Sequence, residues 1–452
     1  MISHPLAVST GLVFVLLGIF FLILVAIRPR VFWPLLIIAS VGTGGLMIFR
    51  NTFTDEYLVY MVVLGGIMPM LVNQLRLQDQ PLPLWQQWHK FFFLGFMGYM
   101  ALESIRGMIV WESPGKMRWV IMFGMLAIIT FFVSKKGFVQ LTPRQMARLL
   151  CLSGFVYCLA YISHGLIAEE FRGISRFTLQ PGEWSTSAYA LFVLIVTVPS
   201  SLFLFKEMHR YWRWLARTSL LVSVAVSLYY FSRASLLVII AFVFLASFQL
   251  GLRKILATVV LPLLIFTLII FSSSSSFAKI MSTGWDELRY TVRDAVTGGS
   301  PDNFDIDRKV HFEAGLLGLR QNAMQFLVGS GFRTSGTVIS PHLRRLYTDY
   351  GFPKLALKVS DDESTEAFTA FLIDTGMVGV TLLCINLLLT GYGIIRSGNS
   401  WRYVFLLTLL FAVLWLPIIN ILDIMVWYFL FMPFGILWQL TRSDPSLKEN
   451  VI

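Results

Sequence analysis

Charged residues are scarce in this chain. Only 13% of its 452 residues are Asp, Glu, Lys or Arg, whereas an ordinary soluble domain carries about 25%, so a soluble globular fold is excluded. Hydrophobic residues make up 56%, and they recur in runs of about 20 residues, the length that a helix needs to cross a bilayer. The sequence therefore predicts an all-α integral membrane protein.

Cysteine and the common cofactor motifs are also scarce. The three cysteines, Cys151, Cys158 and Cys384, all lie in apolar segments, which leaves no disulfide framework and no metal-type spacing. No GxxxxGK[ST] or HExxH motif occurs, and GSGF at 329–332 lacks the strand-to-helix context of a dinucleotide site. We therefore expect no metal and no cofactor. The net charge of +11 does not predict nucleic-acid binding, because in a membrane protein it first reports the positive-inside bias.

The apolar runs predict about thirteen transmembrane helices. Their boundaries, accurate to a few residues, are 8–27, 31–49, 57–72, 91–110, 117–133, 147–167, 185–205, 214–231, 234–250, 255–272, 366–395, 402–416 and 424–440. The eleventh run is long enough to include a turn outside the membrane. The chain thus divides into helices one to ten at 1–272, one large loop at 273–365 and helices eleven to thirteen at 366–452.

Basic residues set the orientation of these helices. If the N-terminus is outside, the inner connections hold eighteen Lys and Arg residues, and the short outer connections hold seven. The other eleven lie in the loop at 273–365, which the positive-inside rule largely ignores because of its length. We therefore expect a multi-pass protein with its N-terminus outside, its C-terminus inside and the large loop outside.

The loop at 273–365 is not typical of a passive linker. Acidic, basic and apolar residues alternate along it, and Leu, Phe and Met recur at helical spacing from Val310 to Phe326. This pattern predicts one or two amphipathic helices lying over the bundle. Loops of this length are usually functional in compact proteins.

Arginines on the predicted outer side are the most informative charged residues. Arg233 interrupts the apolar run at 223–245, where a cation costs a few kcal/mol or more without a partner or a nearby interface. Guanidinium groups bind phosphate oxygens bidentately, so arginines gathered on one face suit a lipid-linked diphosphate. For single loop arginines, the alternative is ordinary solvation or binding of acidic headgroups. The other outer arginines considered are Arg172, Arg176, Arg289, Arg293, Arg308, Arg320, Arg333, Arg344 and Arg345.

Few acids and bases are candidates for catalysis. Glu103 and Arg106 stand three residues apart on one helical face, which predicts a structural intramembrane ion pair. The sequence DDESTEAF at 361–368 ends the loop, so Glu366 would lie near the membrane surface beside the arginines. Its alternative role is local, because acids favour a helix N-terminus and the Ser and Thr just before it can cap the helix. His342 is one of two histidines in the loop.

Three segments resemble the O-antigen ligase and Wzy-type polymerase superfamily of bacterial envelope glycan enzymes. SRASLL at 232–237 is similar to the short outer turn of that family with its Ser-Arg pair. In DRKVHFEAGLLGLRQNAMQFLVGSGF at 307–332, Arg308 precedes an aromatic residue by four positions and a Gly-x-Gly by about twenty. STEAFTAFLIDTGMVGV at 364–380 resembles the segment after the loop, with its Gly-x-x-Gly. Order, spacing and topology agree over roughly residues 220–395.

The resemblance implies transfer of a glycan from an undecaprenyl diphosphate carrier to an acceptor hydroxyl, without a metal or a nucleotide sugar. Arg233 and Arg308 would hold the diphosphate and stabilise its leaving charge, and Glu366 would act as the base, with His342 or Asp362 as the alternative base. Candidate substrate-binding residues are Arg172, Arg176, Arg333, His342 and Asp362.

One departure from the family pattern favours a polymerase of oligosaccharide repeat units over a ligase. Ligases carry His-Asn at the head of the helix after the loop, and this chain has Thr365 and Glu366 there. The alternatives are a ligase onto a terminal acceptor, a flippase or transporter of the lipid-linked unit, and a scaffold without catalytic activity. The resemblance implies the bacterial inner membrane, an active site facing the periplasm, and a chain-length regulator and a flippase as partners.

Overall fold

The computed structural model describes residues 5–28, 31–37, 60–68, 84–112, 117–133, 143–167, 197–198, 200–205, 208–229, 303–320, 322–361 and 367–396. Within these ranges the protein is all-helical and has no strand, which confirms the predicted helical class. The helices are α1 (Pro5–Ile27), α2 (Phe32–Ile37), α4 (Leu84–Val110), α5 (Met117–Val133), α6 (Pro143–Ile167), α8 (Arg210–Tyr229), α13 (Asn303–Arg320), α14 (Ala323–Val328), α15 (Ser335–Asp349), α16 (Pro353–Ala356) and α17 (Ala367–Arg396).

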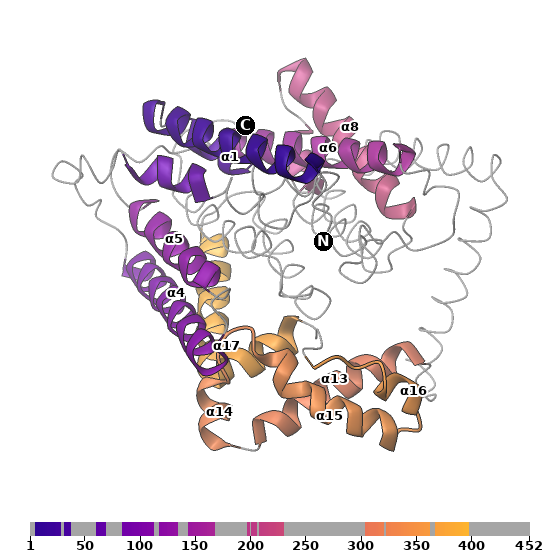
Figure 1. Ribbon diagram of the computed structural model, residues 1–452. Helices are drawn as coiled ribbons and strands as arrows, with labels where there is room; N and C mark the ends of the chain where they lie inside the picture. The colour runs from indigo at the N-terminus through magenta and orange to yellow at the C-terminus, as the bar shows by residue number, and fades with distance from the viewer. Residues whose placement is uncertain are drawn as a thin grey trace.

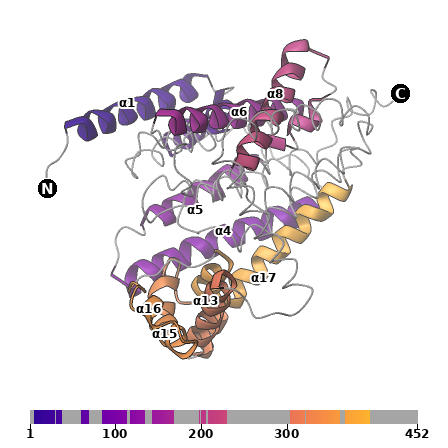
Figure 2. The same cartoon turned by 90° about the vertical axis from the view of Figure 1, so that its right-hand side faces the viewer.

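The longer helices lie in three groups (Figures 1 and 2). At one end, α1, α6 and α8 lie together, and α6 packs against α8. At the opposite end, α13, α14, α15 and α16 gather into a separate cluster. Between the two groups, α4 packs against both α5 and α17, and α17 begins inside the α13–α16 cluster and leaves it alongside α4.

Two helices of the described chain, α4 and α17, are long and apolar enough to cross a membrane. Only 39% and 28% of their most apolar windows are buried, which is not typical of core helices in a soluble protein. Large apolar side chains point outward instead: Leu102 of α4 is 64% exposed and Leu388 of α17 is 73% exposed. This combination indicates membrane association.

These two helices are antiparallel neighbours. The Tyr99 hydroxyl oxygen lies 2.7 Å from the carbonyl oxygen of Thr375, and His89 Nε2 lies 3.1 Å from Thr390 Oγ1. Residue numbers thus rise along α17 as they fall along α4. The C-terminal end of α4 and the N-terminal end of α17 therefore lie together, as alternation of the predicted spans requires.

The observed helices extend the predicted apolar runs mainly at their N-terminal ends. α4 begins at Leu84 instead of residue 91, α6 at Pro143 instead of 147, and α8 at Arg210 instead of 214, whereas α5 has the predicted bounds 117–133. Hydropathy marks only the apolar part of a helix, and polar residues such as Gln and Arg continue it. The predicted spans that lie outside the described residues are 234–250, 255–272, 402–416 and 424–440.

A break divides α17 at Gly376, whose φ of 61° and ψ of −166° are not helical. The segment therefore contains a turn of the chain, and that this turn lies outside the membrane stays a prediction. The part before the break packs against the α13–α16 cluster, and the part after it runs beside α4.

The α13–α16 cluster confirms the amphipathic helices predicted between Val310 and Phe326. Val310 of α13, Ile339 and Leu343 of α15 and Ile373 of α17 are fully buried in one apolar core. Asn322 separates α13 from α14, because its side-chain oxygen accepts a hydrogen bond from the Met324 amide (2.9 Å) and caps the new helix.

The helix α15 was not predicted. Pro341 lies inside it, and a proline that removes a helical hydrogen bond normally argues against a continuous helix. The buried face of α15, which includes Ile339, Leu343 and Tyr347, compensates by packing onto α13 and α17. Tertiary packing here outweighs local preference.

Candidate functional site

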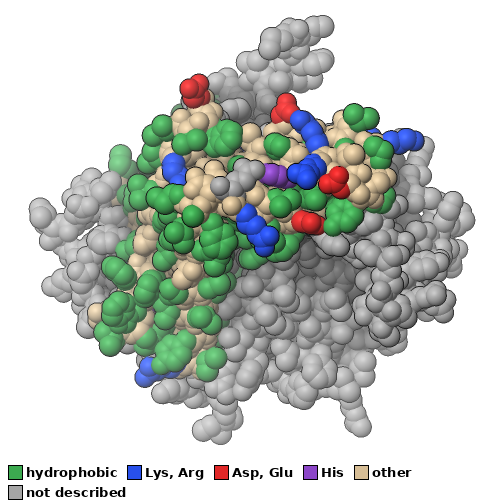
Figure 3. All heavy atoms as spheres, turned by 90° about the horizontal axis from the view of Figure 1, so that it is seen from below, with side chains coloured by type: hydrophobic (Ala, Val, Ile, Leu, Met, Phe, Trp, Pro, Cys, Tyr) green, Lys and Arg blue, Asp and Glu red, His purple; other side chains and the backbone are tan. Residues whose placement is uncertain are grey.

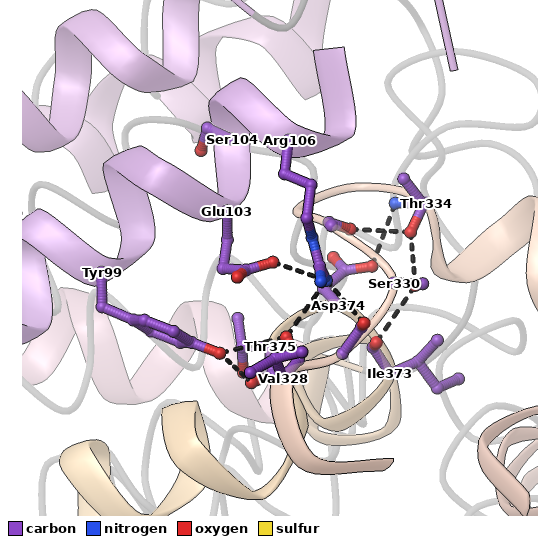
Figure 4. A network of polar contacts seen from close by, with 12 residues as sticks. Tyr99, Glu103, Ser104, Arg106, Val328, Ser330, Thr334, Ile373, Asp374 and Thr375 are labelled. Carbon is purple, nitrogen blue, oxygen red and sulfur yellow. Dashed lines mark hydrogen bonds and ion pairs between the residues drawn. The ribbon is translucent and has the colours of Figure 1, made fainter. Parts of the chain in front are cut away.

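Polar side chains near the C-terminal end of α4 contact the segment that joins α14 to α15 (Figure 4). Glu103 Oε2 and Arg106 Nη2 are 2.7 Å apart, which confirms the predicted ion pair. Arg106 Nη2 also donates to the carbonyl oxygens of Val328 (3.1 Å) and Gly329 (2.5 Å). Arg106 therefore links α4 to the segment between α14 and α15, and Glu103 neutralises its charge.

The segment Gly329–Thr334, here called the GSGFRT loop, wraps around Asp374 of α17. The Asp374 carboxylate accepts three backbone hydrogen bonds, from the amides of Arg333 (2.6 Å), Thr334 (3.0 Å) and Ser335 (2.8 Å). It is completely buried and lies at the N-terminus of α15, where the helix dipole favours an anion. Asp374 is thus the cap of α15 supplied by another helix. Because its oxygens are engaged by three amides and the side chain is fully buried, Asp374 is not placed to act on a substrate.

Two glycine motifs separated in the sequence meet at this point. A Cβ on Gly329, which has a φ of 81°, would lie 2.3 Å from the Asp374 carbonyl oxygen, and a Cβ on Gly376 would lie 2.4 Å from the Gly329 nitrogen. Both positions thus combine a positive φ with a backbone-to-backbone contact that leaves no room for a Cβ, and only glycine permits this combination. The Gly-x-Gly of the loop and the Gly-x-x-Gly after it, both part of the family resemblance, are therefore in direct contact.

A third glycine allows α4 to approach the loop. A Cβ on Gly107 would lie 2.6 Å from the Phe332 carbonyl oxygen.

We expect Gly107→Ala to lower the free energy of unfolding by about 2 kcal/mol, the usual cost of overpacking, measured by thermal unfolding in detergent. Gly98→Ala is the matched control on the same helix, because a Cβ there meets nothing within 4 Å. It should be neutral or stabilising by up to about 1 kcal/mol. Equal effects of the two substitutions would contradict the close approach.

Phe332 anchors the centre of the GSGFRT loop. Its ring is completely buried and packs edge-on against Trp119 and Phe123 of α5, with centroid distances of 5.0 and 5.3 Å. Its amide donates to the Glu103 carbonyl oxygen at 2.9 Å. The loop is therefore fixed to α4, α5 and α17 at once.

Arg333 is presented by this anchored loop in an unusual conformation. Its φ is 61°, a left-handed value that costs a residue with a Cβ of order 1 kcal/mol or more and persists only where surrounding contacts impose it. The hydrogen bond from its amide to Asp374 is one such contact. The guanidinium carbon of Arg333 lies 5.3 Å from the ring centroid of Trp119, and that of Arg118 lies 5.8 Å from the same centroid. The buried indole Nε1 of Trp119 has no acceptor in the described structure.

This arrangement concentrates hydrogen-bond donors at the loop end of α4 and α5. Two guanidinium groups from segments far apart in the sequence share one indole ring, and guanidinium groups stay charged at every relevant pH. Among the described acids, Glu103 pairs with Arg106, and Asp374 accepts hydrogen bonds from the loop amides. Two guanidinium groups beside one indole ring suit binding of an anion.

His342 lies on α15 and is half-buried beside α13, since a Cβ on Gly318 would lie 3.8 Å from its Cδ2. Burial, and then the charge of Arg345, lower the pKa of the His342 imidazole below its usual range. The ring is therefore neutral at pH 7 and can accept a proton.

The predicted site residues are only partly within the described chain. Arg333 is in the GSGFRT loop and His342 is on α15. Arg308 lies on α13, of which only the backbone is described at that position. The candidates outside the described residues are Arg172, Arg176, Arg233, Asp362 and Glu366. Among the side chains that the structure describes, no group of three or more His, Cys, Asp or Glu residues is placed to hold a metal.

Sequence reasoning missed Asp374, Arg118 and Trp119 as members of this site. A signal for Asp374 was present, because it is the only charged residue between Glu366 and Arg396, the same kind of position that drew attention to Arg233. Trp119 carries no such signal, since a tryptophan in an apolar helix is most often part of a core.

Comparison with known proteins gave no match: no family model, no curated protein and no solved structure resembles the chain at a significant level.

Proposed function

We propose that the protein is a polymerase that joins undecaprenyl-diphosphate-linked oligosaccharide repeat units into a surface polysaccharide at the periplasmic face of the bacterial inner membrane. The observation that carries the proposal is the convergence of Arg118 and Arg333 on Trp119 at one end of the apolar helices. Guanidinium pairs suit a diphosphate, and a lipid-linked diphosphate is held at the level of a membrane surface. The contact between the two glycine motifs supports the resemblance on which the sugar chemistry rests.

In the proposed reaction, the acceptor hydroxyl oxygen attacks the anomeric carbon of the donor glycan. The bond between that carbon and the diphosphate oxygen breaks, and undecaprenyl diphosphate leaves with both electrons. Glu366 takes the hydroxyl proton. Arg233 and Arg308 bind the diphosphate and stabilise its growing charge, assisted by Arg333. No metal or cofactor takes part.

The proposed topology has about thirteen transmembrane helices, a periplasmic N-terminus and a cytoplasmic C-terminus, with 273–365 as the periplasmic loop. The antiparallel pairing of α4 and α17 supports this topology, because the two helix ends proposed to be periplasmic lie together, and both contact the GSGFRT loop. A chain-length regulator and a flippase are the partner proteins that such a polymerase would use.

The direct test supplies purified protein in lipid nanodiscs with a polyprenyl-diphosphate-linked oligosaccharide as the only sugar substrate. A polymerase should convert it into a ladder of longer lipid-linked products, visible by gel electrophoresis and mass spectrometry, and release polyprenyl diphosphate. Transfer that occurs only after a second, terminal acceptor is added would identify a ligase. Movement of the donor across vesicles without any new glycosidic linkage would identify a flippase, and either result would overturn the proposal.

A further inference from the structure

The short helix α14 exposes an unusual amount of apolar surface. Met324 is 63% exposed, Leu327 is 52% exposed and Phe326 is 41% exposed, and α14 has no buried side chain. The helix packs against α17. Exposed apolar patches of this kind mark contact with another protein, a ligand or a membrane.

The break in α17 shows at what depth α14 lies. The part of α17 after Gly376, residues 377–396, is about 30 Å long at 1.5 Å per residue, which matches the hydrocarbon thickness of a bilayer. Leu327 lies directly beside the break, since a Cβ on Gly376 would lie 2.5 Å from its carbonyl oxygen. If residues 377–396 span the hydrocarbon layer, the C-terminal end of α14 is level with its edge.

Aromatic residues mark the opposite edge. The rings of Trp85 and Tyr392 pack edge-on at 5.9 Å, Trp88 is 51% exposed, and Arg396 donates to the Tyr392 hydroxyl at 2.8 Å. Tryptophan and tyrosine favour the interface between lipid and water, and arginine snorkels to it. From Trp88 to Arg106, which contacts the C-terminal end of α14, α4 rises about 27 Å at 1.5 Å per residue, close to the hydrocarbon thickness, and Ile109 just beyond is 67% exposed.

The rest of the cluster has a different surface. Figure 3 shows hydrophobic side chains densest on one side of the described face, and most of the charged side chains on the other. Arg344 and Arg345 of α15 and Lys354 of α16 are exposed, as is Asp361, which pairs with Arg344. Water suits this side, whereas lipid suits the side that α14 shares with α4 and α17.

We infer that α14 is an interfacial membrane anchor: its exposed Met324, Phe326 and Leu327 insert into the acyl chains of the leaflet that borders the loop end of α4 and α17. The inference follows from the exposed apolar side chains of α4, α14 and α17, and it requires membrane association but not polymerase activity. The anchor holds the adjoining GSGFRT loop, and with it Arg333, at the depth of the lipid headgroups. In the proposed function, the anchor would therefore keep the Arg333 guanidinium at the level of the diphosphate of a lipid-linked donor.

Spin-label accessibility tests this placement in the full-length protein in nanodiscs of phosphatidylcholine and phosphatidylglycerol. Single labels are introduced by Met324→Cys and Leu327→Cys after the native cysteines are replaced by alanine. The matched control is Leu357→Cys, because Leu357 is also apolar and even more exposed (88%) but lies just after α16 between lysines. A separate variant in which only Cys151 and Cys158 are replaced keeps Cys384, exposed on α17 beyond the break, and labels it as the reference for the proposed membrane-spanning part of α17.

At positions 324 and 327, collisions with oxygen should exceed collisions with a water-soluble nickel chelate, as at Cys384, and the order should reverse at position 357. The ratio of the two accessibilities should differ several-fold between the anchor and the control. Nickel accessibility at 324 and 327 equal to that at 357 would overturn the anchor. Dipolar broadening between labels on two copies would overturn it as well, because a second chain would then cover α14. Neither result would decide whether the protein is a polymerase, because that is tested separately by lengthening of the lipid-linked donor.

Discussion

Replacing Arg333 by alanine is expected to lower the rate of polymer formation about 100-fold, the usual effect of removing a preorganised donor from a developing negative charge. The substitution removes the guanidinium beside Trp119 but keeps a Cβ at the left-handed backbone position, so the conformation of the loop is unchanged. The amide of residue 333 can still donate to Asp374. The measurement is the initial rate of lengthening of the lipid-linked donor at equal protein concentration.

Arg345→Ala is the matched control for this loss. Its side chain is 81% exposed and lies 3.6 Å from Asp349, so its removal should change the rate less than twofold. Arg333→Lys should recover only part of the rate, since an ammonium group cannot bind two phosphate oxygens through a planar fork. The same mechanism predicts losses at least as large for Arg233→Ala and Arg308→Ala. Normal rates in these variants, at normal protein levels, would rule the arginine mechanism out.

Replacing Asp374 by asparagine is expected to loosen the GSGFRT loop selectively. Three backbone amides share the two oxygens of this buried carboxylate, and asparagine retains one oxygen and places an NH2 group where the other was. Loss of the charge and of at least one acceptor should favour local opening by about 3 kcal/mol. This corresponds to roughly 100-fold faster hydrogen exchange of the amides in 330–335, because each 1.4 kcal/mol is about tenfold. Mass spectrometry of a peptide covering the loop measures this directly.

Asp361→Asn provides the comparison for that experiment. Asp361 lies in the same cluster and pairs with Arg344, but its side chain is 94% exposed, and exposed ion pairs contribute little. Exchange in the GSGFRT loop should therefore be unchanged by it. If Asp374→Asn also left exchange in 330–335 at the level of the unsubstituted protein, Asp374 would not be what holds the loop.

The sequence predicted those features that depend on residues close together along the chain. The apolar runs at 117–133 and 366–395 became α5 and α17, the spacing of Glu103 and Arg106 predicted their pair, and the amphipathic pattern after Val310 predicted α13 and α14. Each of these follows from a helical period of 3.6 residues applied within one segment.

The candidate site was only partly predictable for the opposite reason. Its geometry depends on contacts between residues far apart in the chain, such as the amide of Arg333 on Asp374 or the ring of Phe332 on Trp119. Neither contact has a local signature. The glycines did give a signal, since the resemblance included Gly329 and Gly376, but only the structure explains why both positions exclude a Cβ.

The spacing of Glu103 and Arg106 has a consequence for biosynthesis. Arg106 binds the carbonyl oxygen of Gly329, which lies 223 residues further along the chain. At 5–20 residues per second, a ribosome takes roughly 10 to 45 seconds to make that stretch, so α4 is complete long before Gly329 is added. During this interval the guanidinium already has a carboxylate one helical turn away, so the charge of Arg106 is compensated before Gly329 has been made.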